Sequence, residues 1–335
     1  MKINDWINQI KDSNTRIAIP LLSQRGVEII GEKMINAVKN GYIQYRAIKA
    51  IADKFPSSAV TMFMDLSVEA EAFGMETCYA ENEVPTILSS GAQSEEFIKK
   101  LEIPSLSKDR IPQYLEAATL VVENIMDRPV FAGCIGPFSL AARIYDVTEV
   151  MTAILIEPEL MKILLEKCTD FLIKYCSAYK SAGAAGVIMA EPVSGMLSPE
   201  LCYLFSSIYI KKIVENVQDK DFIIILHNCG NTNPLLKEMQ LTGAKGFHFG
   251  NKSDIIETLE YINHERLVMG NIDPVGVFRF GTPETVKNIT TGLLEKTSTY
   301  TNFILSSGCD LPKDIPIENI RAFYSALNDF NNKIV

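Results

Sequence analysis

The sequence predicts an α/β fold, specifically a (β/α)8 TIM barrel with an N-terminal helical extension. Short apolar segments alternate with helical patterns along most of the chain, and this alternation is typical of a parallel sheet covered by helices. Several apolar segments end in polar side chains, which favours a closed barrel, because barrel enzymes place their chemistry where the strands end. An open doubly wound sheet is the competing arrangement. A chain of 335 residues fits one such barrel, so we expect a single domain over 1–335.

Composition excludes several classes of protein. The net charge of −9 argues against a nucleic-acid surface, which requires clustered basic residues. No apolar run is long enough to predict a membrane span, and Asp5 and Asp12 stand where a signal peptide would have its apolar core. The 7 cysteines are an odd number without the close spacing of a disulfide scaffold. We therefore expect a reducing compartment, the cytoplasm.

The N-terminal half shows helices as apolar residues three or four apart and buried strands as short unbroken apolar runs. The expected elements are a helix over 1–15, a strand over 16–22, helices over 31–40 and 44–55, a strand over 59–67, a helix over 68–74, an irregular segment over 75–108 with a short helix near 95–101, a helix over 111–126 and a strand over 128–137.

The C-terminal half continues the alternation, and its longest helix begins at a proline and ends before a glycine, as helices commonly do. After a short helical piece that follows Phe138, the expected elements are a helix over 158–182, a strand over 186–195, a helix over 199–217, a strand over 222–230, a helix over 235–240, a strand over 246–250, a helix over 255–262, a strand over 266–274, a helix over 282–296, a strand from 303 leading to Cys309 and a helix over 317–330.

The strand over 222–230, FIIILHNCG, suggests a transition-metal site. His227 and Cys229 are two apart, so their side chains point to the same side of the strand. Cys309 follows another apolar strand, and the ends of parallel strands meet at one rim of a barrel. One His and two Cys leave the fourth position of a zinc ion open, as in catalytic zinc sites. The alternative is that both cysteines are small buried apolar residues.

Two carboxylates also follow strands and are candidate catalytic residues. Asp65 ends the run over 59–67, and Glu191 ends the run that begins at Gly186. Asp65 could equally cap the helix that follows it, and Glu191 could be a solvated loop acid. The sequence leaves both alternatives open.

Several segments resemble the uroporphyrinogen decarboxylase superfamily, and more narrowly its branch of zinc-dependent methylcobamide:coenzyme M methyltransferases. They are HNCGN (227–231), GNIDP (270–274) with GTPE (281–284), SSGCDLPKDIPIENIRAF (306–323), FMDLSVEAEAFG (63–74) and GPFSLAA (136–142). The resemblance covers the chain from about residue 15 to the end. Its metal motif, His-x-Cys with a distant Cys, is fairly specific for the methyltransferase branch.

The resemblance implies that His227, Cys229 and Cys309 hold a zinc ion and that a small thiol such as coenzyme M occupies the open position. The thiol would take a methyl group from a methylcobamide. Asp65 or Glu191 would orient the thiol or the ligands, and His248 is a further candidate to support a ligand. The sequence has no Asp-x-His-x-x-Gly pattern for holding a corrinoid, so the corrinoid is expected on a separate carrier protein.

Two other functions stay open. A uroporphyrinogen decarboxylase-like carboxy-lyase is the runner-up, because Asp65 matches the decarboxylase aspartate. However, the stretch over 16–26 has few of the arginines that decarboxylases use, their tyrosine falls on Arg143, and their late histidine falls on Cys309. A binding module for zinc or for a corrinoid protein, without turnover, is the third hypothesis.

Overall fold

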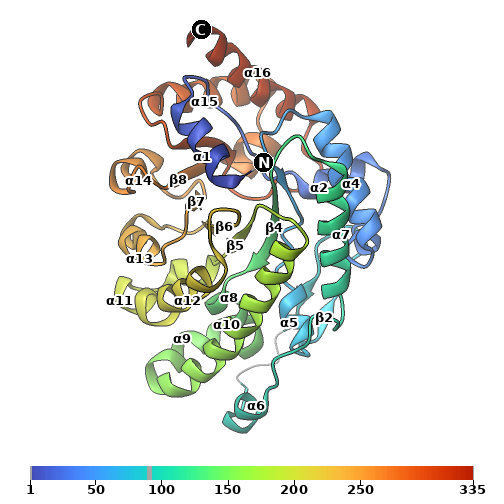
Figure 1. Cartoon of the computed structure of the whole chain (residues 1–335), viewed down its shortest axis with the longest axis vertical. Coiled ribbons are helices and arrows are strands. Elements are labelled where there is room, and N and C mark those ends of the chain that lie inside the picture. Colours follow the sequence, from blue (N-terminus) through green and yellow to red (C-terminus); the bar gives the residue numbers. More distant parts are fainter. Residues whose placement is uncertain (1, 89–92, 335) are drawn as a thin grey trace.

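A parallel sheet of seven strands forms the centre of the molecule in a computed structural model that describes residues 2–88 and 93–334 (Figure 1). The strands follow one another in the order β1-β4-β5-β6-β7-β8-β9, and each neighbouring pair is parallel. Their bounds are β1 (Val60–Thr61), β4 (Val130–Ile135), β5 (Gly186–Ala190), β6 (Ile223–Asn228), β7 (Gly246–Phe249), β8 (Leu267–Ile272) and β9 (Phe303–Ser307). The predicted α/β class is confirmed.

The segment over 16–22 lies between β9 and β1 and connects the two edges of the sheet. Ala18 forms a parallel bridge with Leu305 of β9, and the backbone N–H of Ile19 donates to the carbonyl of Leu305 at 2.9 Å. On the other side, the N–H of Ser58 donates to the carbonyl of Ala18 at 3.0 Å. The strand predicted here is a single bridge rather than a regular strand, and it completes a TIM-barrel-like arrangement.

Apart from α1, helices cover the outer side of the sheet (Figure 1). Their bounds are α1 (Ile3–Asp12), α2 (Ser23–Ile29), α3 (Met34–Val38), α4 (Gly41–Lys54), α5 (Val68–Ala72), α6 (Glu95–Lys100), α7 (Ile111–Asn124), α8 (Pro137–Tyr145), α9 (Val147–Ile156), α10 (Pro158–Ser181), α11 (Pro199–Cys202), α12 (Ile208–Val217), α13 (Leu236–Leu241), α14 (Ile255–Tyr261), α15 (Pro283–Lys296) and α16 (Ile317–Ile334). Short 3₁₀ turns cover Pro192–Met196 and Asn233–Leu235, and π-helical turns cover Tyr203–Ser207 and Pro274–Arg279. None of the helices in the described ranges is long and apolar enough to cross a membrane.

The interior of the barrel is filled by apolar side chains that alternate along the strands, among them Phe131, Ile188 and Ile225. Helix α1 contributes its buried face to the same cluster, and the ring centroids of Trp6 and Phe131 lie 5.8 Å apart. Since the cluster includes the first residues of β6 and β8, α1 closes the end of the barrel where the strands begin. The predicted N-terminal helical extension therefore covers this end of the barrel.

A few elements differ from expectation. The strand predicted over 59–67 pairs with β4 only at β1, after which the chain leaves the sheet toward Asp65. The segment predicted to be irregular, 75–108, contains an antiparallel hairpin of β2 (Thr77–Cys78) and β3 (Thr86–Ile87) as well as α6, and its residues 89–92 lie outside the described ranges. The long helix predicted over 158–182 is present as α10. A single domain over the whole chain stays a prediction.

Candidate metal centre

The strand β6 delivers His227 to the open end of the barrel. Ile223 and Ile225 of this strand point into the barrel interior, and the alternation along a strand places His227 on the same side. Cys229 follows just after the strand, where it packs so closely on Gly250 that a Cβ there would lie 2.6 Å from the Cα of Cys229. Glycine at 250 therefore allows the chain after β7 to support the Cys229 turn.

Cys309 joins His227 and Cys229 from the end of β9, although 82 residues separate it from His227 in sequence. One ligand atom from each residue lies within 4.8 Å of the others, and the Sγ of Cys309 is 3.8 Å from Nε2 of His227. His227 is buried, whereas the two cysteines are half-buried. The structure thus brings together the three side chains that the sequence singled out.

The two thiols interact directly with each other. The hydrogen bond from Cys309, followed by the contact with His227, lowers the pKa of Cys229. The same hydrogen bond, together with burial, raises the pKa of Cys309. An imidazole nitrogen and two sulfurs, one of them readily deprotonated, are the donors that zinc prefers. This group of atoms fits a zinc ion.

His248, predicted to support a ligand, lies beside His227 on the neighbouring strand β7. The two Nδ1 atoms are 2.7 Å apart, and Nε2 of His248 is 2.9 Å from the hydroxyl of Ser306. That hydroxyl donates to the carbonyl of Ile19 at 2.7 Å. Burial lowers the pKa of His248 well below its usual value. The sequence analysis missed Ser306, although alternation from the interior Ile304 would have placed it inside the barrel.

Asp310, the residue after Cys309, was also missed. It accepts hydrogen bonds from the hydroxyl of Ser23 at 2.9 Å and from the amide of Gln24 at 3.3 Å, both at the start of α2. Burial raises the pKa of Asp310 to about 6. These bonds tie the loop that carries Cys309 to the N-terminal part of the chain. A segment distant in sequence therefore helps to hold this thiol in place.

Asp65 lies in a buried ion-pair network. Its Oδ1 accepts from the N–H of Ser67 at 3.0 Å and from the Ser67 hydroxyl at 2.6 Å. Its Oδ2 accepts from the phenol of Tyr114 at 2.6 Å and from Arg110. Arg110 also donates from Nε to Glu71 at 2.5 Å and from Nη2 to the hydroxyl of Ser67 at 2.8 Å. Both oxygens of Asp65 therefore have partners.

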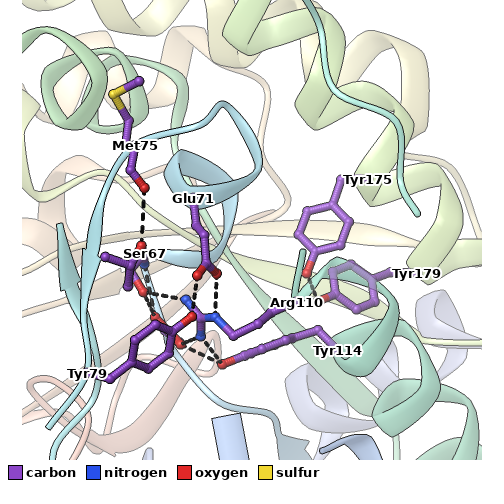
Figure 2. Close-up of polar contacts among 10 residues, drawn as sticks. Ser67, Glu71, Met75, Tyr79, Arg110, Tyr114, Tyr175 and Tyr179 are labelled. Carbon is purple, nitrogen blue, oxygen red and sulfur yellow. Dashed lines mark hydrogen bonds and ion pairs between the residues drawn. The ribbon is translucent and has the colours of Figure 1, made fainter. Parts of the chain in front are cut away.

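Figure 2 shows the Arg110 guanidinium directed between Glu71 and Ser67, with the ring of Tyr79 beside it. The phenol of Tyr79 donates to Glu71, which joins the chain after β2 to α5. The network therefore connects the end of β1 with α5, the hairpin and α7. Arg110 could not be found from sequence, because it precedes α7 without any motif. Whether Asp65 also acts in catalysis stays a prediction.

Glu191 is buried but directed toward the helices outside the sheet. Val187 and Met189 of β5 lie in the outer cluster, and the same alternation turns Glu191 outward. Its Oε1 accepts from the N–H of Ser139 in the first turn of α8 at 2.9 Å, and burial raises its pKa to about 8. Its backbone N–H donates to the carbonyl of His227 at 2.9 Å. A catalytic role for Glu191 stays a prediction.

A family model described as "Uroporphyrinogen decarboxylase (URO-D)" matches residues 16–330. The chain belongs to the URO-D family. Curated relatives of this URO-D protein include the methylcobamide:CoM methyltransferase MtbA of Methanosarcina acetivorans, which is 28% identical over 276 residues, and MtaA of Methanosarcina barkeri, which is 27% identical over 277 residues. Each match covers 81% of this chain and 80% of the relative. A uroporphyrinogen decarboxylase of Vibrio campbellii is 24% identical, with 83% of this chain and 80% of the relative covered.

Solved structures agree with the fold of this URO-D protein. A methyltransferase from Methanosarcina mazei superimposes with a TM-score of 0.87 over 97% of both chains, at 23% sequence identity. A B12-independent methionine synthase from Shewanella sp. W3-18-1 matches with a TM-score of 0.60 over 96% of both chains, at 13% identity. At these identities the similarity shows the shared barrel architecture.

Proposed function

We propose that this URO-D family protein is a zinc-dependent methyltransferase. It would move a methyl group from a methylated corrinoid, carried by a partner protein, to a small thiol such as coenzyme M. The observation that carries the proposal is the convergence of His227, Cys229 and Cys309 at the open end of the barrel. The relatives named methylcobamide:CoM methyltransferase, at 27% and 28% identity, support it.

The three side chains define what the site would hold and where. Nε2 of His227 and the two sulfurs would bind the ion, since Nδ1 of His227 is occupied by its contact with His248. Zinc bound by three protein ligands keeps a position for an incoming thiol and lowers the pKa of that thiol. The two cysteine sulfurs bring negative charge to the site, which favours an electron-rich sulfur on the substrate.

The transfer itself can be written without further reactants. A sulfur–carbon bond forms, the cobalt–carbon bond breaks, and its electron pair stays on cobalt. The proton of the thiol leaves to solvent or to a nearby base. The prediction that Asp65 or Glu191 orients the thiol receives no support from the geometry, because both Asp65 oxygens bond to protein groups and Glu191 is directed away from the barrel interior. The sequence has no Asp-x-His-x-x-Gly pattern, so we assign the corrinoid to a carrier protein. Reduced ligand thiols are consistent with the expected cytoplasmic location.

The geometry of Asp65 favours this proposal over a carboxy-lyase. A decarboxylase of the type considered above would need this carboxylate to bind its substrate. Here both carboxylate oxygens accept hydrogen bonds from protein groups, and the side chain is 1% exposed. Breaking these bonds would remove one of the two carboxylates that compensate the buried Arg110, which is costly.

Metal content tests the proposal first. We expect purified wild-type protein to contain about one zinc ion per chain, and Cys309→Ala to lose it, because two ligands do not hold zinc firmly. The matched control is Cys78→Ala, since Cys78 is exposed and outside the site; this variant should keep its zinc. The zinc content per chain is measured by elemental analysis after mild chelator treatment.

Turnover is then measured with methylcobalamin as donor and coenzyme M as acceptor. Wild type and Cys78→Ala should form the thioether, and Cys309→Ala should not. Wild-type protein that contains no zinc, or Cys309→Ala protein with wild-type zinc and turnover, would contradict the proposal. Zinc without turnover on any thiol would favour the binding-module hypothesis.

A further inference from the structure

A chain of hydrogen bonds behind His227 ends at a backbone carbonyl. Because a carbonyl only accepts hydrogen bonds, it fixes the direction of the bond made to it. The chain runs from the carbonyl of Ile19 through the hydroxyl of Ser306 to Nε2 of His248, and from Nδ1 of His248 to Nδ1 of His227. The four residues come from the segment before α2 and from β9, β7 and β6. All four are buried, with between 0% and 3% of their surface exposed.

A carbonyl oxygen only accepts hydrogen bonds, so the Ser306 hydroxyl must donate its single hydrogen to Ile19. The oxygen of Ser306 is then an acceptor toward His248, and the hydrogen between them belongs to Nε2 of His248. The distances of 2.7 Å and 2.9 Å on the two sides of the hydroxyl are those of well-formed hydrogen bonds.

The two Nδ1 atoms of the histidines face each other at 2.7 Å, and this distance leaves room for one hydrogen between them. Nδ1 of His227 also lies 3.2 Å from the backbone carbonyl of His248. A carbonyl oxygen only accepts hydrogen bonds, so the hydrogen belongs to Nδ1 of His227.

We propose that Ser306 and His248 are positioning residues that hold His227 in a single tautomer, with hydrogen on Nδ1 and the free electron pair on Nε2. This inference rests on the proposed function, since Nε2 is the atom offered to the metal. It is supported by Cys309, whose Sγ lies 3.8 Å from Nε2. A histidine that binds a metal commonly donates its other N–H to a supporting group; here that group is a second histidine.

The backbone explains why this arrangement is rigid. His227 and His248 are register partners on adjacent strands β6 and β7, and Ser306 belongs to β9, with β8 between. The ring of strands fixes all three backbones, so neither imidazole can turn without losing a hydrogen bond. Preorganisation of this kind lowers the cost of presenting a lone pair to the ion.

The tautomer can be observed directly in zinc-free protein. The chain has 3 histidines, so ¹⁵N-labelled imidazoles give few signals in long-range ¹H–¹⁵N correlation spectra, and His264→Leu identifies the exposed third ring. We expect wild-type His227 to show hydrogen on Nδ1 alone. Ser306→Ala, which deletes one hydroxyl, should yield a mixture of tautomers. Hydrogen on Nε2 of wild-type His227 would overturn the inference.

Zinc affinity is the second readout, measured by competition with a chelator. His248→Leu removes the ring nitrogen that accepts from Nδ1 of His227 and leaves only the backbone carbonyl of residue 248, 3.2 Å away, so zinc binding should weaken about 10-fold. His248→Asn offers an oxygen near the place of Nδ1 and should recover most of the affinity, while His264→Leu should bind like wild type. If His248→Leu fails to fold, Ser306→Ala alone decides, through its spectrum and affinity.

The two proposals fail in different ways. Wild-type protein that binds no zinc would remove the proposed function, while the tautomer spectrum would still test the role of Ser306 and His248. Wild-type protein that binds zinc tightly, with His248→Leu and Ser306→Ala equally tight, would overturn only the positioning role.

Discussion

Arg110 is the residue on which the region around Asp65 depends. Its guanidinium donates to Asp65, Ser67 and Glu71 at once, and its side chain is 6% exposed. A buried ion pair adds little net stability, but removal of one partner leaves a charge without compensation. The two carboxylates that Arg110 connects are Asp65, which lies just before α5, and Glu71, which lies within it.

We therefore predict that Arg110→Met lowers the free energy of unfolding by about 3–5 kcal/mol, measured by urea denaturation followed by circular dichroism. Lys49→Met is the matched control, because Lys49 pairs with Asp53 on the exposed surface of α4. Its effect should stay below about 1 kcal/mol. Equal effects in the two variants would show that the Arg110 network is not a structural unit.

At the scale of elements, helix α8 is held at its first turn by a residue of another element. Glu191 accepts from the N–H of Ser139, and its second oxygen has no hydrogen-bond partner within the described part of the chain. A Cβ at Gly136 would lie 1.5 Å from that oxygen, so glycine is required where α8 begins. Burial raises the pKa of Glu191 to about 8.

This shift predicts a pH dependence of stability. Below about pH 4 the carboxyl is protonated in both states. Between about pH 4 and about pH 8 the carboxyl of the unfolded chain loses its proton, while that of the folded chain keeps it. The free energy of unfolding therefore falls as pH rises through this range. Glu191→Gln, neutral throughout, should gain unfolding free energy relative to wild type by up to about 1.4 kcal/mol per pH unit across this window.

Denaturation curves at pH 5, 6.5 and 8 measure the difference between Glu191→Gln and wild type. Glu123→Gln, at an exposed position on α7, should follow the wild-type curve. A difference for Glu191→Gln that is the same at all three pH values would contradict the assignment of a neutral buried carboxyl.

At the scale of the whole molecule, the barrel separates a structural end from a chemical end. Helix α1 lies across the end where the strands begin (Figure 1), and the single tryptophan, Trp6, packs there against Phe131. The candidate metal centre lies at the other end, after β6 and β9. In barrel enzymes the same division separates stability from catalysis.

We accordingly expect Trp6→Ala to lower the free energy of unfolding by about 3–5 kcal/mol, since it empties a large volume in the core, while zinc affinity stays at the wild-type value. Tyr42→Ala, an aromatic residue that is 55% exposed, should change stability by less than about 0.5 kcal/mol. Loss of zinc affinity in folded Trp6→Ala protein would mean that the two ends are coupled.

Much of this architecture could be predicted from sequence, because it depends on local rules. Unbroken apolar runs identified strands β4 to β9, and the order of strands and helices indicated a parallel sheet. The positions of His227 and Cys229 followed from the two-residue period of a strand, and Cys309 followed from the shared rim of parallel strands. These inferences need only the backbone of each element and the closure of the sheet.

The sequence by itself determined the α/β class and the three candidate metal ligands. Tertiary structure alone decided the remaining features: the closure at Ala18, the pairing of Arg110 with Asp65, the outward direction of Glu191 and the contact of Ser306 with the carbonyl of Ile19. The last contact joins residues 287 positions apart. Such contacts arise when whole elements pack, because the partner of a buried polar group is chosen by the space around it rather than by its neighbours in the chain.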